Sequence, residues 1–267
     1  GCFYTIDGFI HFNGCVEETD YLDLICPADH AQAVWKATFN CLLTSLEIDW
    51  SQIDLCNIPF ASPSRAIFPA LAAESGFQVI ESVQEVCPVI QLPDTFDEYL
   101  ESLDSKQRRE LTRKLRRADG SEVQNTIVGT DDDLAIEVEN FLELLQKSTY
   151  EKRDWLNPGR RALFHDVARA AQQSNTLQLI FTTIEDSRAA ALFNFDYNGR
   201  IWVYNSGLDP TAFAALSPGV VLTAKAIEIA IQLGRHEFDF LRGNEDYKYR
   251  FGATDTFIYR LRMDRMP

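Results

Sequence analysis

The chain of 267 residues is long enough for one large domain or two small ones, and 46% hydrophobic and 12% aromatic residues can form a substantial core. Disorder is therefore not expected as a description of the whole chain. The formal net charge of −15 argues against broad nonspecific binding to nucleic acids or anionic membranes, because both surfaces repel an acidic protein.

The first third of the chain has the pattern of an α/β unit. Asp7-Gly8 separates two short apolar segments, and this dipeptide is typical of hairpin turns. The elements that we expect next are a strand at 21–25, a helix at 31–46, a strand at 52–58, a helix opened by Ser62-Pro63, and apolar strands around 77–80 and 86–92. We assign residues 1–93 to a first domain.

Leu92-Pro93 interrupts this pattern, and a second domain is expected over residues 94–267. Thr95 and Glu98 have the spacing of a capping box, which predicts a linking helix over 95–118. Within it, residues 106–117 carry seven basic side chains and one acidic one, a local charge of +6 that leaves −21 for the rest of the chain. Such asymmetry indicates either a docking surface for an anion or a solvated helix face, and both interpretations stay open.

The second domain is expected to form a mixed sheet flanked by helices. The expected order is a strand at 124–128, helices at 132–146 and 158–173, strands at 176–184, 189–197 and 201–206, a helix at 218–233, a strand at 237–241, a short charged helix, and a strand at 256–263. Turns at 185–187 and at Asn198-Gly199 join the three central strands into an antiparallel meander. The fold class predicted for the chain is thus α/β, of the α+β kind with a mixed sheet.

The cysteines and histidines give no pattern of a metal site or a catalytic triad. The six cysteines lie within the first 87 residues without a C-x-x-C pair, and the four histidines are scattered. We expect no metal, free buried thiols in a reducing cytosol, and hence a cytoplasmic protein. No apolar run approaches the ~20 residues of a membrane span, so membrane insertion is not expected. The only methionines are Met263 and Met266, which indicates a sequence that lacks its natural beginning.

The element order over residues 121–267 resembles the GNAT N-acyltransferase fold. The run SPGVVLTAKAIEIAIQLGRHEFDFLRGNEDYKYRFGA at 217–253 looks like the C-terminal signature of bacterial GNAT proteins related to a cellulose-biosynthesis acetyltransferase, and SLDSKQRRELTRKLRRA resembles the helix between the two halves of that family. The family is similar to Fem-type transferases, which carry two GNAT-like halves and add amino acids to cell-wall precursors from aminoacyl-tRNA. The resemblance implies tandem GNAT-like domains, of which the first, 1–93, is incomplete or degenerate.

The resemblance also places an acyl-CoA co-substrate in a split between strands 201–206 and 237–241, with its pyrophosphate on the N-terminus of helix 218–233. A helix N-terminus offers unpaired N–H groups and a positive dipole end to an anion, although Ser-Pro-Gly is equally a plain N-cap. Segment 212–219 is poorer in glycine and basic residues than the usual GNAT phosphate loop. The cofactor-binding residues expected on this basis are Tyr204, Asn205, Ser206, Ser217, Gly219, Val220, Arg242 and Arg250.

Three residues near the end of strand 237–241 are the expected catalytic groups. Strand alternation places Asp239 at a mostly apolar position, where burial would raise its pKa toward that of a general base, whereas pairing with Arg242 or Lys248 would lower it. In many GNAT enzymes a tyrosine of the following short helix protonates the leaving thiolate, which implies Tyr247 for that role. Lys248 resembles a basic residue that Fem-type enzymes carry in a similar segment.

The leading expectation is an enzyme that transfers an acetyl or other acyl group from acyl-CoA to a small-molecule amine, such as a sugar, an amino acid or a precursor of the cell envelope or of a polysaccharide. The first alternative is Fem-type transfer from aminoacyl-tRNA, with the basic helix on tRNA phosphates; steep salt dependence of tRNA binding would distinguish it. The second alternative is a non-catalytic GNAT-like module of a polysaccharide or envelope system.

Overall fold

The structure is a computed structural model that describes residues 3–15, 18–44 and 50–264. The chain divides into two compact units. Unit 1 comprises Gly1–Cys87, Arg242–Asn244 and Asp255–Pro267, and unit 2 comprises Pro88–Leu241 and Glu245–Thr254. The division falls within one long strand, β4 (Val79–Gln91), shortly before the predicted boundary at residue 93.

Unit 1 is a sheet with two helices, in the strand order β1-β2-β3-β10-β4. Its elements are β1 (Phe3–Ile6), β2 (Phe9–Phe12), η1 (Ala28–His30), α1 (Ala31–Thr44), β3 (Gln52–Pro59), α2 (Ser64–Glu74), the first part of β4 and nearly all of β10 (Thr254–Asp264). β10 belongs to this unit, rather than to the predicted second domain, because it pairs antiparallel with β3. Trp35 and Phe39 of α1 and Phe68 of α2 are buried against Ile53 and Leu55 of β3.

The predicted elements of unit 1 are confirmed with two differences. Asp7 and Gly8 both have positive φ and join β1 to β2, as expected of this turn. Residues 21–25 are not a strand: the Leu22 amide donates to the carbonyl oxygen of Asn57 in β3 at 2.9 Å, but this bond does not extend into a ladder. The strands expected around 77–80 and 86–92 form the single strand β4. The end of the helix expected at 31–46 lies outside the described residues.

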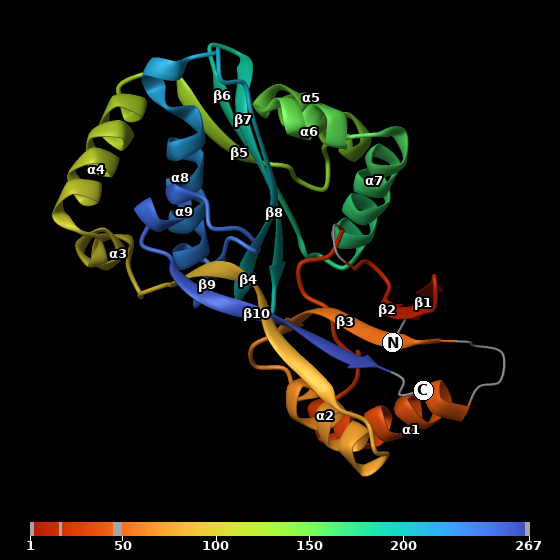
Figure 1. The fold of residues 1–267 in the computed structure, drawn as a ribbon. Helices are drawn as coiled ribbons and strands as arrows, with labels where there is room; N and C mark the ends of the chain where they lie inside the picture. The colour runs from red at the N-terminus through yellow and green to blue at the C-terminus, as the bar shows by residue number, and fades with distance from the viewer. Residues whose placement is uncertain (1–2, 16–17, 45–49, 265–267) are drawn as a thin grey trace. The chain divides into compact units, whose positions relative to one another are not determined.

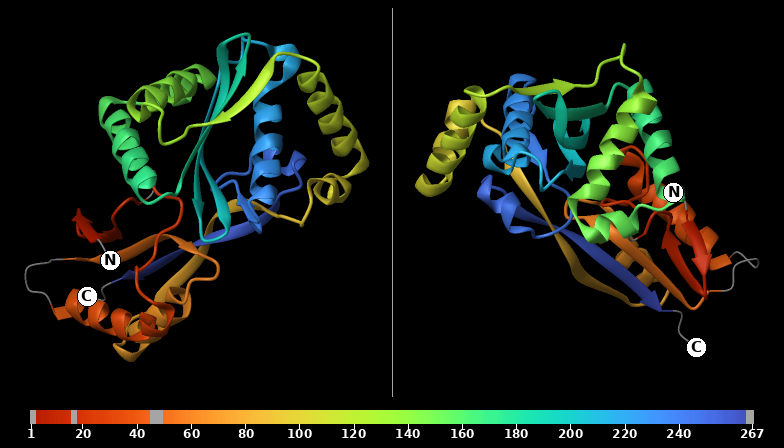
Figure 2. Two further views of the ribbon diagram at one scale, coloured as in Figure 1. Left: turned by 180° about the vertical axis from the view of Figure 1, so that it is seen from behind. Right: turned by 90° about the horizontal axis from the view of Figure 1, so that it is seen from above.

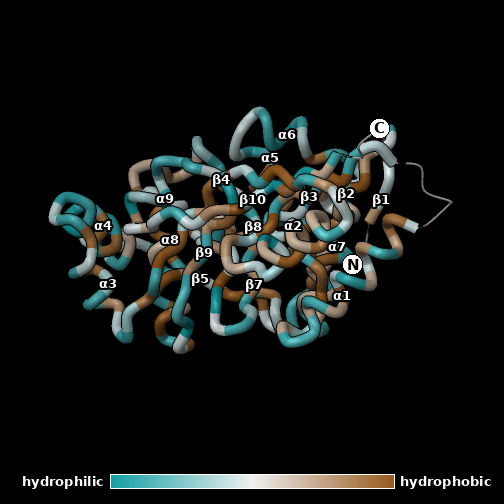
Figure 3. The backbone as a smooth tube through the Cα atoms, turned by 60° about the horizontal axis from the view of Figure 1, so that its bottom comes forward, coloured by the Kyte–Doolittle hydropathy of each residue, from teal (hydrophilic) through white to brown (hydrophobic). Residues whose placement is uncertain are grey.

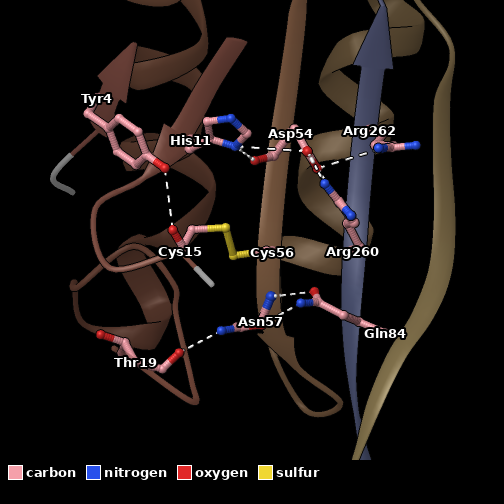
Figure 4. Close-up of a disulfide and its surroundings, with 10 residues drawn as sticks. All are labelled: Tyr4, His11, Cys15, Thr19, Asp54, Cys56, Asn57, Gln84, Arg260 and Arg262. Carbon is pink, nitrogen blue, oxygen red and sulfur yellow. Dashed lines mark hydrogen bonds and ion pairs between the residues drawn. A yellow bond between two sulfur atoms is a disulfide. The ribbon is translucent and has the colours of Figure 1, made fainter. Parts of the chain in front are cut away.

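A disulfide joins Cys15 to Cys56, whose Cα atoms lie 6.1 Å apart (Figure 4). The expectation that all thiols are free was therefore wrong for this pair, because sequence spacing gives no sign that the loop after β2 returns to β3. Cys26 and Cys41 are free thiols. The side-chain amide of Asn57, next to Cys56, bonds Gln84 and the carbonyl oxygen of Thr19. The start of the chain is thus fastened to β3 by covalent and polar contacts.

Unit 2 continues from the second part of β4 in the strand order β4-β9-β8-β7-β6-β5. Its elements are α3 (Phe96–Ser102), α4 (Ser105–Asp119), β5 (Val123–Ile127), α5 (Leu134–Ser148), α6 (Tyr150–Trp155), α7 (Pro158–Gln173), β6 (Leu177–Ile184), β7 (Ser187–Tyr197), β8 (Arg200–Leu208), η2 (Ala214–Leu216), α8 (Pro218–Gln232), β9 (Glu237–Asp239) and α9 (Asp246–Arg250). β5, β6, β7 and β8 pair antiparallel, and β8 and β9 pair parallel. The sheet is therefore mixed, as predicted.

The sheet of unit 2 has helices on both faces (Figures 1 and 2). Alternate residues of β7 point to opposite faces, as a strand requires: Ala190 and Leu192 join the core beneath α8, whereas Ala191 and Phe193 join the core beneath α5 and α7. α4 packs on the outer side of α8, and Figure 3 shows the contrast between hydrophilic α4 and hydrophobic α8. α8 is thus covered on one side by the sheet and on the other by α4.

The expected elements of unit 2 are confirmed with three differences. The linking helix breaks into α3 and α4 at Leu103-Asp104, because the Asp104 side chain accepts hydrogen bonds from the first amides of a new helix. α6 was not predicted. It begins at a Thr149 cap immediately after α5, where the sequence shows only a short charged segment. β9 ends at Asp239 instead of residue 241 because Leu241 takes positive φ.

The segment Ala214–Gln232, which contains η2 and α8, has the length and hydropathy of a membrane-crossing helix. Half of that stretch is nevertheless buried in the protein, and Ala224, Ile227 and Ala230 are completely inaccessible. We therefore interpret α8 as the central helix of the unit 2 core.

Candidate functional site

β8 and β9 separate after a short parallel ladder. Within the described chain, their pairing runs from Arg200↔Glu237 to Trp202↔Asp239, while β8 continues to Leu208. The register of β8 against β7 also shifts, because Phe193 pairs with Asn205 and Asn194 with Val203. This shift makes Tyr204 the extra residue of a bulge, which bends the strand. Ser206, Gly207 and Leu208 are therefore the part of β8 that extends beyond its contact with β9.

A pocket of about 430 Å³ occupies this opening in unit 2. Its walls come from β7, the end of β8, the loop 209–217, the first turns of α8, and the aromatic residues Phe240, Tyr247 and Phe251. The lining residues are Ala190, Ala191, Leu192, Val203, Ser206, Gly207, Leu208, Asp209, Pro210, Ala212, Ala214, Ser217, Pro218, Gly219, Val220, Leu222, Thr223, Phe240, Tyr247 and Phe251. The lining is mainly apolar and contains neither lysine nor arginine.

Gly207 allows β8 to approach α5. A Cβ atom at this position would lie 2.7 Å from the Cβ atom of Leu144 and 2.7 Å from the backbone nitrogen of Leu145. Gly219, at the start of α8, is different, because a Cβ atom there would meet only the Leu208 side chain at 3.7 Å. Gly207 is therefore required by packing, whereas Gly219 leaves open space on the pocket side.

α8 begins at the mouth of the pocket. Pro218 is its first residue, and Ser217 before it has φ 52° and ψ 54°, a left-handed conformation that is uncommon for serine. Phe213 in the same loop also has positive φ. The amides of Val220 and Val221 donate to the carbonyl oxygen of Ser217 at 3.0 and 3.1 Å. Strained residues of this kind cluster at ligand sites, and Ser217 is among the residues that line this pocket.

Lys152 of α6 reaches the same strand. Its Nζ donates to the carbonyl oxygen of Ser206 at 2.7 Å and contacts Ser206 Oγ at 3.4 Å. Burial lowers the pKa of Lys152 to about 8, Glu245 opposes this shift, and Lys248 adds to it. A substantial fraction of Lys152 is therefore neutral just above neutral pH, although lysine in water stays charged.

A second pocket, of about 660 Å³, shares Asp209 and Pro210 with the first. It is formed by the end of α5, the start of α6 and the loop after β8. Its lining residues are Glu143, Gln146, Lys147, Ser148, Thr149, Tyr150, Arg153, Asp209, Pro210 and Thr211. Thr211 and neighbouring amides donate to Asp209, and together they lower the pKa of its carboxyl group. The first pocket is apolar, and the second offers charged groups of both signs.

The family model of the acetyltransferase (GNAT) domain matches residues 105–249, more than half of the chain. The chain belongs to this family. The fold class predicted from the sequence is thereby confirmed, and the chain is an N-acyltransferase of GNAT type. Domains of this family generally bind acyl-CoA.

Solved structures with the same fold match both units of this GNAT protein. FemX has a TM-score of 0.66 at 10% identity, covering 92% of this chain and 82% of its own. The C-terminal domain assigned to a lysylphosphatidylglycerol synthetase from Agrobacterium fabrum has a TM-score of 0.62 at 8% identity, covering 99% and 80%. L-PGS from Bacillus licheniformis has a TM-score of 0.60 at 9% identity, covering 97% and 79%. The search of curated proteins found no match.

The structure brings several predicted GNAT site residues to the first pocket. Ser206, Ser217, Gly219 and Val220 line it, and so does Tyr247. The ring of Tyr247 packs edge-on against Phe240 at 5.9 Å between centroids. Desolvation and Glu245 raise the pKa of its phenol, which therefore stays protonated around neutral pH.

The other predicted residues are not among those that line the pocket. The Tyr204 ring packs 5.5 to 6.0 Å from Phe164, Phe193 and Phe195 in the core beneath α5 and α7, and the side chain of Asn205 accepts from the Ser206 amide. Their predicted part in cofactor binding stays a prediction.

The charged residues of the predicted set make structural contacts. Asp239 is buried, and its Oδ1 accepts from the Leu241 amide at 2.7 Å, where the chain turns after β9. Lys248 is also buried and pairs with Glu245 at 2.9 Å. Arg242 belongs to unit 1, where it pairs with Asp20. Arg250 is exposed on α9, and its charge helps to lower the pKa of Glu110 on α4.

Lys152 was missed at the sequence level. The only available signal was a lysine beside aromatic residues in TYEKRDW, which looks like a solvated turn. No group of three or more metal-binding side chains is arranged for an ion in residues 3–15, 18–44 and 50–264.

Proposed function

We propose that the chain transfers an acyl group from acyl-CoA to the amine of a small molecule. The observation that carries this proposal is the pocket in the split between β8 and β9, which opens at the first turn of α8. A pantetheine arm is long, thin and mostly apolar, with amides that pair with an open strand. The apolar walls suit the arm and its acyl group. At the edge of β8, side chains of Lys152, Asn205 and Ser148 now bond the backbone of Ser206 and Leu208, and the amides of the arm would take their place.

The second pocket supports an amine as the acceptor. It meets the first at Asp209 and Pro210, so a molecule bound there would reach the thioester. Glu143 supplies a carboxylate for an ammonium group, while Arg153 suits an acidic or phosphorylated part of the same molecule. Asp209 and Lys147 pair with each other at 3.5 Å. We infer an acceptor that carries both kinds of group, as an amino acid or an amino-sugar phosphate does.

Amide formation requires a neutral amine and a protonated leaving group. Lys152 in its neutral form takes a proton from the ammonium of the acceptor. The nitrogen lone pair then forms the N–C bond at the thioester carbonyl. The C–S bond breaks as Tyr247 gives its phenolic proton to sulfur. The attacking nitrogen loses its second proton to the tyrosinate, which restores the phenol, and Lys152 releases its proton to solvent. This assignment rests on the position of Lys152 beside Ser206 and of Tyr247 in the pocket wall.

Asp239 and Lys248 remain alternative catalytic groups. The Asp239 carboxylate could serve as the base only if the turn at Leu241 opened, since one oxygen is engaged by that amide. Comparison of Lys152→Met with Asp239→Asn distinguishes the two bases. Loss of single-turnover acylation in the first variant alone supports Lys152, and loss in the second alone supports Asp239.

The donor is tested by calorimetric titration with CoA, acetyl-CoA and a longer acyl-CoA. We expect binding at micromolar strength that is lost in Gly219→Trp, because the indole would fill the pocket at the start of α8. Gly219→Ala is the matched control, since its methyl group meets only Leu208 at ordinary contact distance. The absence of heat with all three ligands would contradict the proposal.

Aminoacyl-tRNA is a second candidate donor. The loop 209–217 carries no basic side chain for a pyrophosphate, and the fold matches FemX over both units. A tRNA complex that dissociates steeply with added salt would support this candidate. If neither donor binds while a protein partner does, the non-catalytic GNAT-like module takes its place.

The biological setting that we propose follows the resemblance of segment 217–253 to bacterial GNAT proteins related to cellulose biosynthesis. On that basis the acceptor belongs to the cell envelope or to a polysaccharide pathway, and the protein acts in the cytoplasm. Because disulfides persist mainly in oxidising compartments, the redox state of the Cys15–Cys56 pair in cells tests the cytoplasmic part of the proposal.

A further inference from the structure

The first pocket lacks the positive charge that an acyl-CoA would need. Its lining residues include neither lysine nor arginine, and the first turn of α8 supplies only the partial charge of a helix dipole. CoA carries a pyrophosphate and a 3′-phosphate. Under the proposed function, most of this negative charge must therefore be balanced by residues outside the pocket.

α4, which packs against α8, carries a cluster of arginines outside this pocket. Arg108, Arg109, Arg113 and Arg116, here called the arginine face, line a hollow of about 380 Å³ together with Thr112. All four arginines are exposed, and none of them forms an ion pair within the described part of the chain. Like charges three or four residues apart destabilise a helix, so repulsion among these arginines destabilises α4 until an anion binds to them.

The groups around the arginine face do not neutralise it. Glu110 is the acidic residue within the basic run, and it pairs with Lys114 at 3.1 Å. Lys114, Arg113 and Arg250 of α9 all lower the pKa of Glu110. Arg109 Nε donates to the backbone oxygen of Ser105, which leaves the rest of its guanidinium available.

Other residues of α4 contact the elements that line the donor pocket. Leu111, Leu115 and Ala118 of α4 are buried in the same core as Val221 and Leu222 of α8. Arg117 Nη1 donates to the carbonyl oxygen of Ala215 at 2.9 Å, and the neighbouring Ala214 lines the pocket. α4 and α8 run in opposite directions, so the C-terminal end of α4 lies at the N-terminal end of α8 (Figure 1).

The dimensions match one nucleotide. The eight residues from Arg109 to Arg116 span about 10 Å of helix, and Arg116 is at the end next to the loop 209–217. The pyrophosphate and the 3′-phosphate of CoA are carried on the 5′ and 3′ positions of one ribose and lie closer together than this span, so both fit within it. An RNA strand would need a longer basic track, and the rest of the chain, at −21, would repel it.

We propose that the arginine face of α4 binds the phosphates of the nucleotide end of acyl-CoA. This inference rests on the proposed function and deepens it. The phosphate-binding charge that GNAT proteins usually carry in the loop before the helix would here be supplied by the helix that links the two halves of the chain.

The test compares CoA with S-acetylpantetheine, which lacks the nucleotide, by calorimetric titration of three proteins. They are the wild type, Arg113→Gln/Arg116→Gln, and Lys36→Gln/Arg169→Gln. The last variant removes two exposed charges outside the site and keeps the net charge matched. We expect the first variant to weaken CoA binding about tenfold or more. Its binding of S-acetylpantetheine should be unchanged, and the control should resemble the wild type with both ligands.

Three results would overturn the inference, and they differ in what else they overturn. Wild-type affinity for CoA in Arg113→Gln/Arg116→Gln would leave the acyl-CoA function intact and exclude only the arginine face. A wild type that binds neither CoA nor S-acetylpantetheine would overturn both. If the variant loses binding of a tRNA in a gel-shift assay while its affinity for CoA is unchanged, the face is an RNA contact instead.

Discussion

Lys152 Nζ lies 2.7 Å from the carbonyl oxygen of Ser206, on the part of β8 that has left β9. A carbonyl in the middle of a sheet would accept a backbone amide. Here a lysine from α6 takes that place, beside the pocket and in the field of Lys248 and Glu245. The contact ties the helix that borders the second pocket to the strand that borders the first.

Lys152→Met is expected to reduce kcat/KM for the acceptor about 100-fold. Lys152 acts in its neutral form, whose fraction rises as pH passes the pKa of about 8, so wild-type kcat/KM should rise between pH 6.5 and 9. The pH profile of kcat/KM for the variant should lack this rise and should show only the ionisation of the acceptor amine. Steady-state rates across this pH range provide the measurement.

The control for this prediction is Lys225→Met, which removes a lysine paired with Glu228 on α8. Lys152→Met removes the cost of burying a charge but leaves the Ser206 carbonyl oxygen without this donor, so the two effects oppose each other and the melting temperature at pH 7 should change little. If kcat/KM of Lys152→Met still rises with pH as it does in the wild type, Lys152 is not the base, whatever the change in rate.

Tyr247→Phe is expected to lower kcat about tenfold to 100-fold with little change in KM for acyl-CoA. The ring still packs on Phe240 in the variant, so the pocket wall is kept and only the proton donor is lost. The raised pKa of the phenol keeps it protonated, so the wild-type rate should not fall up to about pH 9. Tyr249→Phe, which alters a residue outside the pocket lining, serves as the control. Equal kcat values for wild type and Tyr247→Phe would remove Tyr247 from the mechanism.

Much of the fold of unit 2 could be predicted from local pattern. The apolar run of α8, the Asn157 cap before Pro158 and the turn at Asn198-Gly199 each determine their element by themselves. β10 could not be placed in this way. Its partner β3 lies about two hundred residues earlier, and its own alternation fits either unit. The pairing depends on contacts between distant segments, which one sequence does not reveal.

The residues of the candidate site likewise include some that the local sequence predicts and others that only contacts between distant segments place. Ser206, Ser217, Gly219 and Tyr247 were predicted because each sits in a segment with a recognisable order of elements. Lys152 was not predicted, because its role depends on α6 folding back onto β8. Arg242 was expected at the cofactor, but its charge is paired with Asp20 in unit 1, and no local signal indicates that partner.

Gly207→Ala is expected to destabilise the protein by about 1 to 3 kcal/mol, as overpacking of a core does. The added methyl group would lie 2.7 Å from Leu144 Cβ and the Leu145 nitrogen, which cannot move without shifting α5 against β8. Gly219→Ala, whose methyl group meets Leu208 at 3.7 Å, should leave the free energy of unfolding nearly unchanged. Urea denaturation of both variants gives the comparison. Equal midpoints for the two would show that α5 adapts to the extra carbon.

Loss of the Cys15–Cys56 disulfide is expected to lower the free energy of unfolding by about 2 to 4 kcal/mol, because the bond closes a long loop of the unfolded chain. Cys56→Ser also removes a completely buried side chain beside Asn57, so reduction of the wild type is the cleaner perturbation. Cys26→Ser changes a free thiol and should have little effect. Urea denaturation with and without reductant measures the difference. Peptide mass spectrometry after alkylation of the unreduced, unfolded protein checks the bond itself, and labelling of Cys15 and Cys56 there would contradict it.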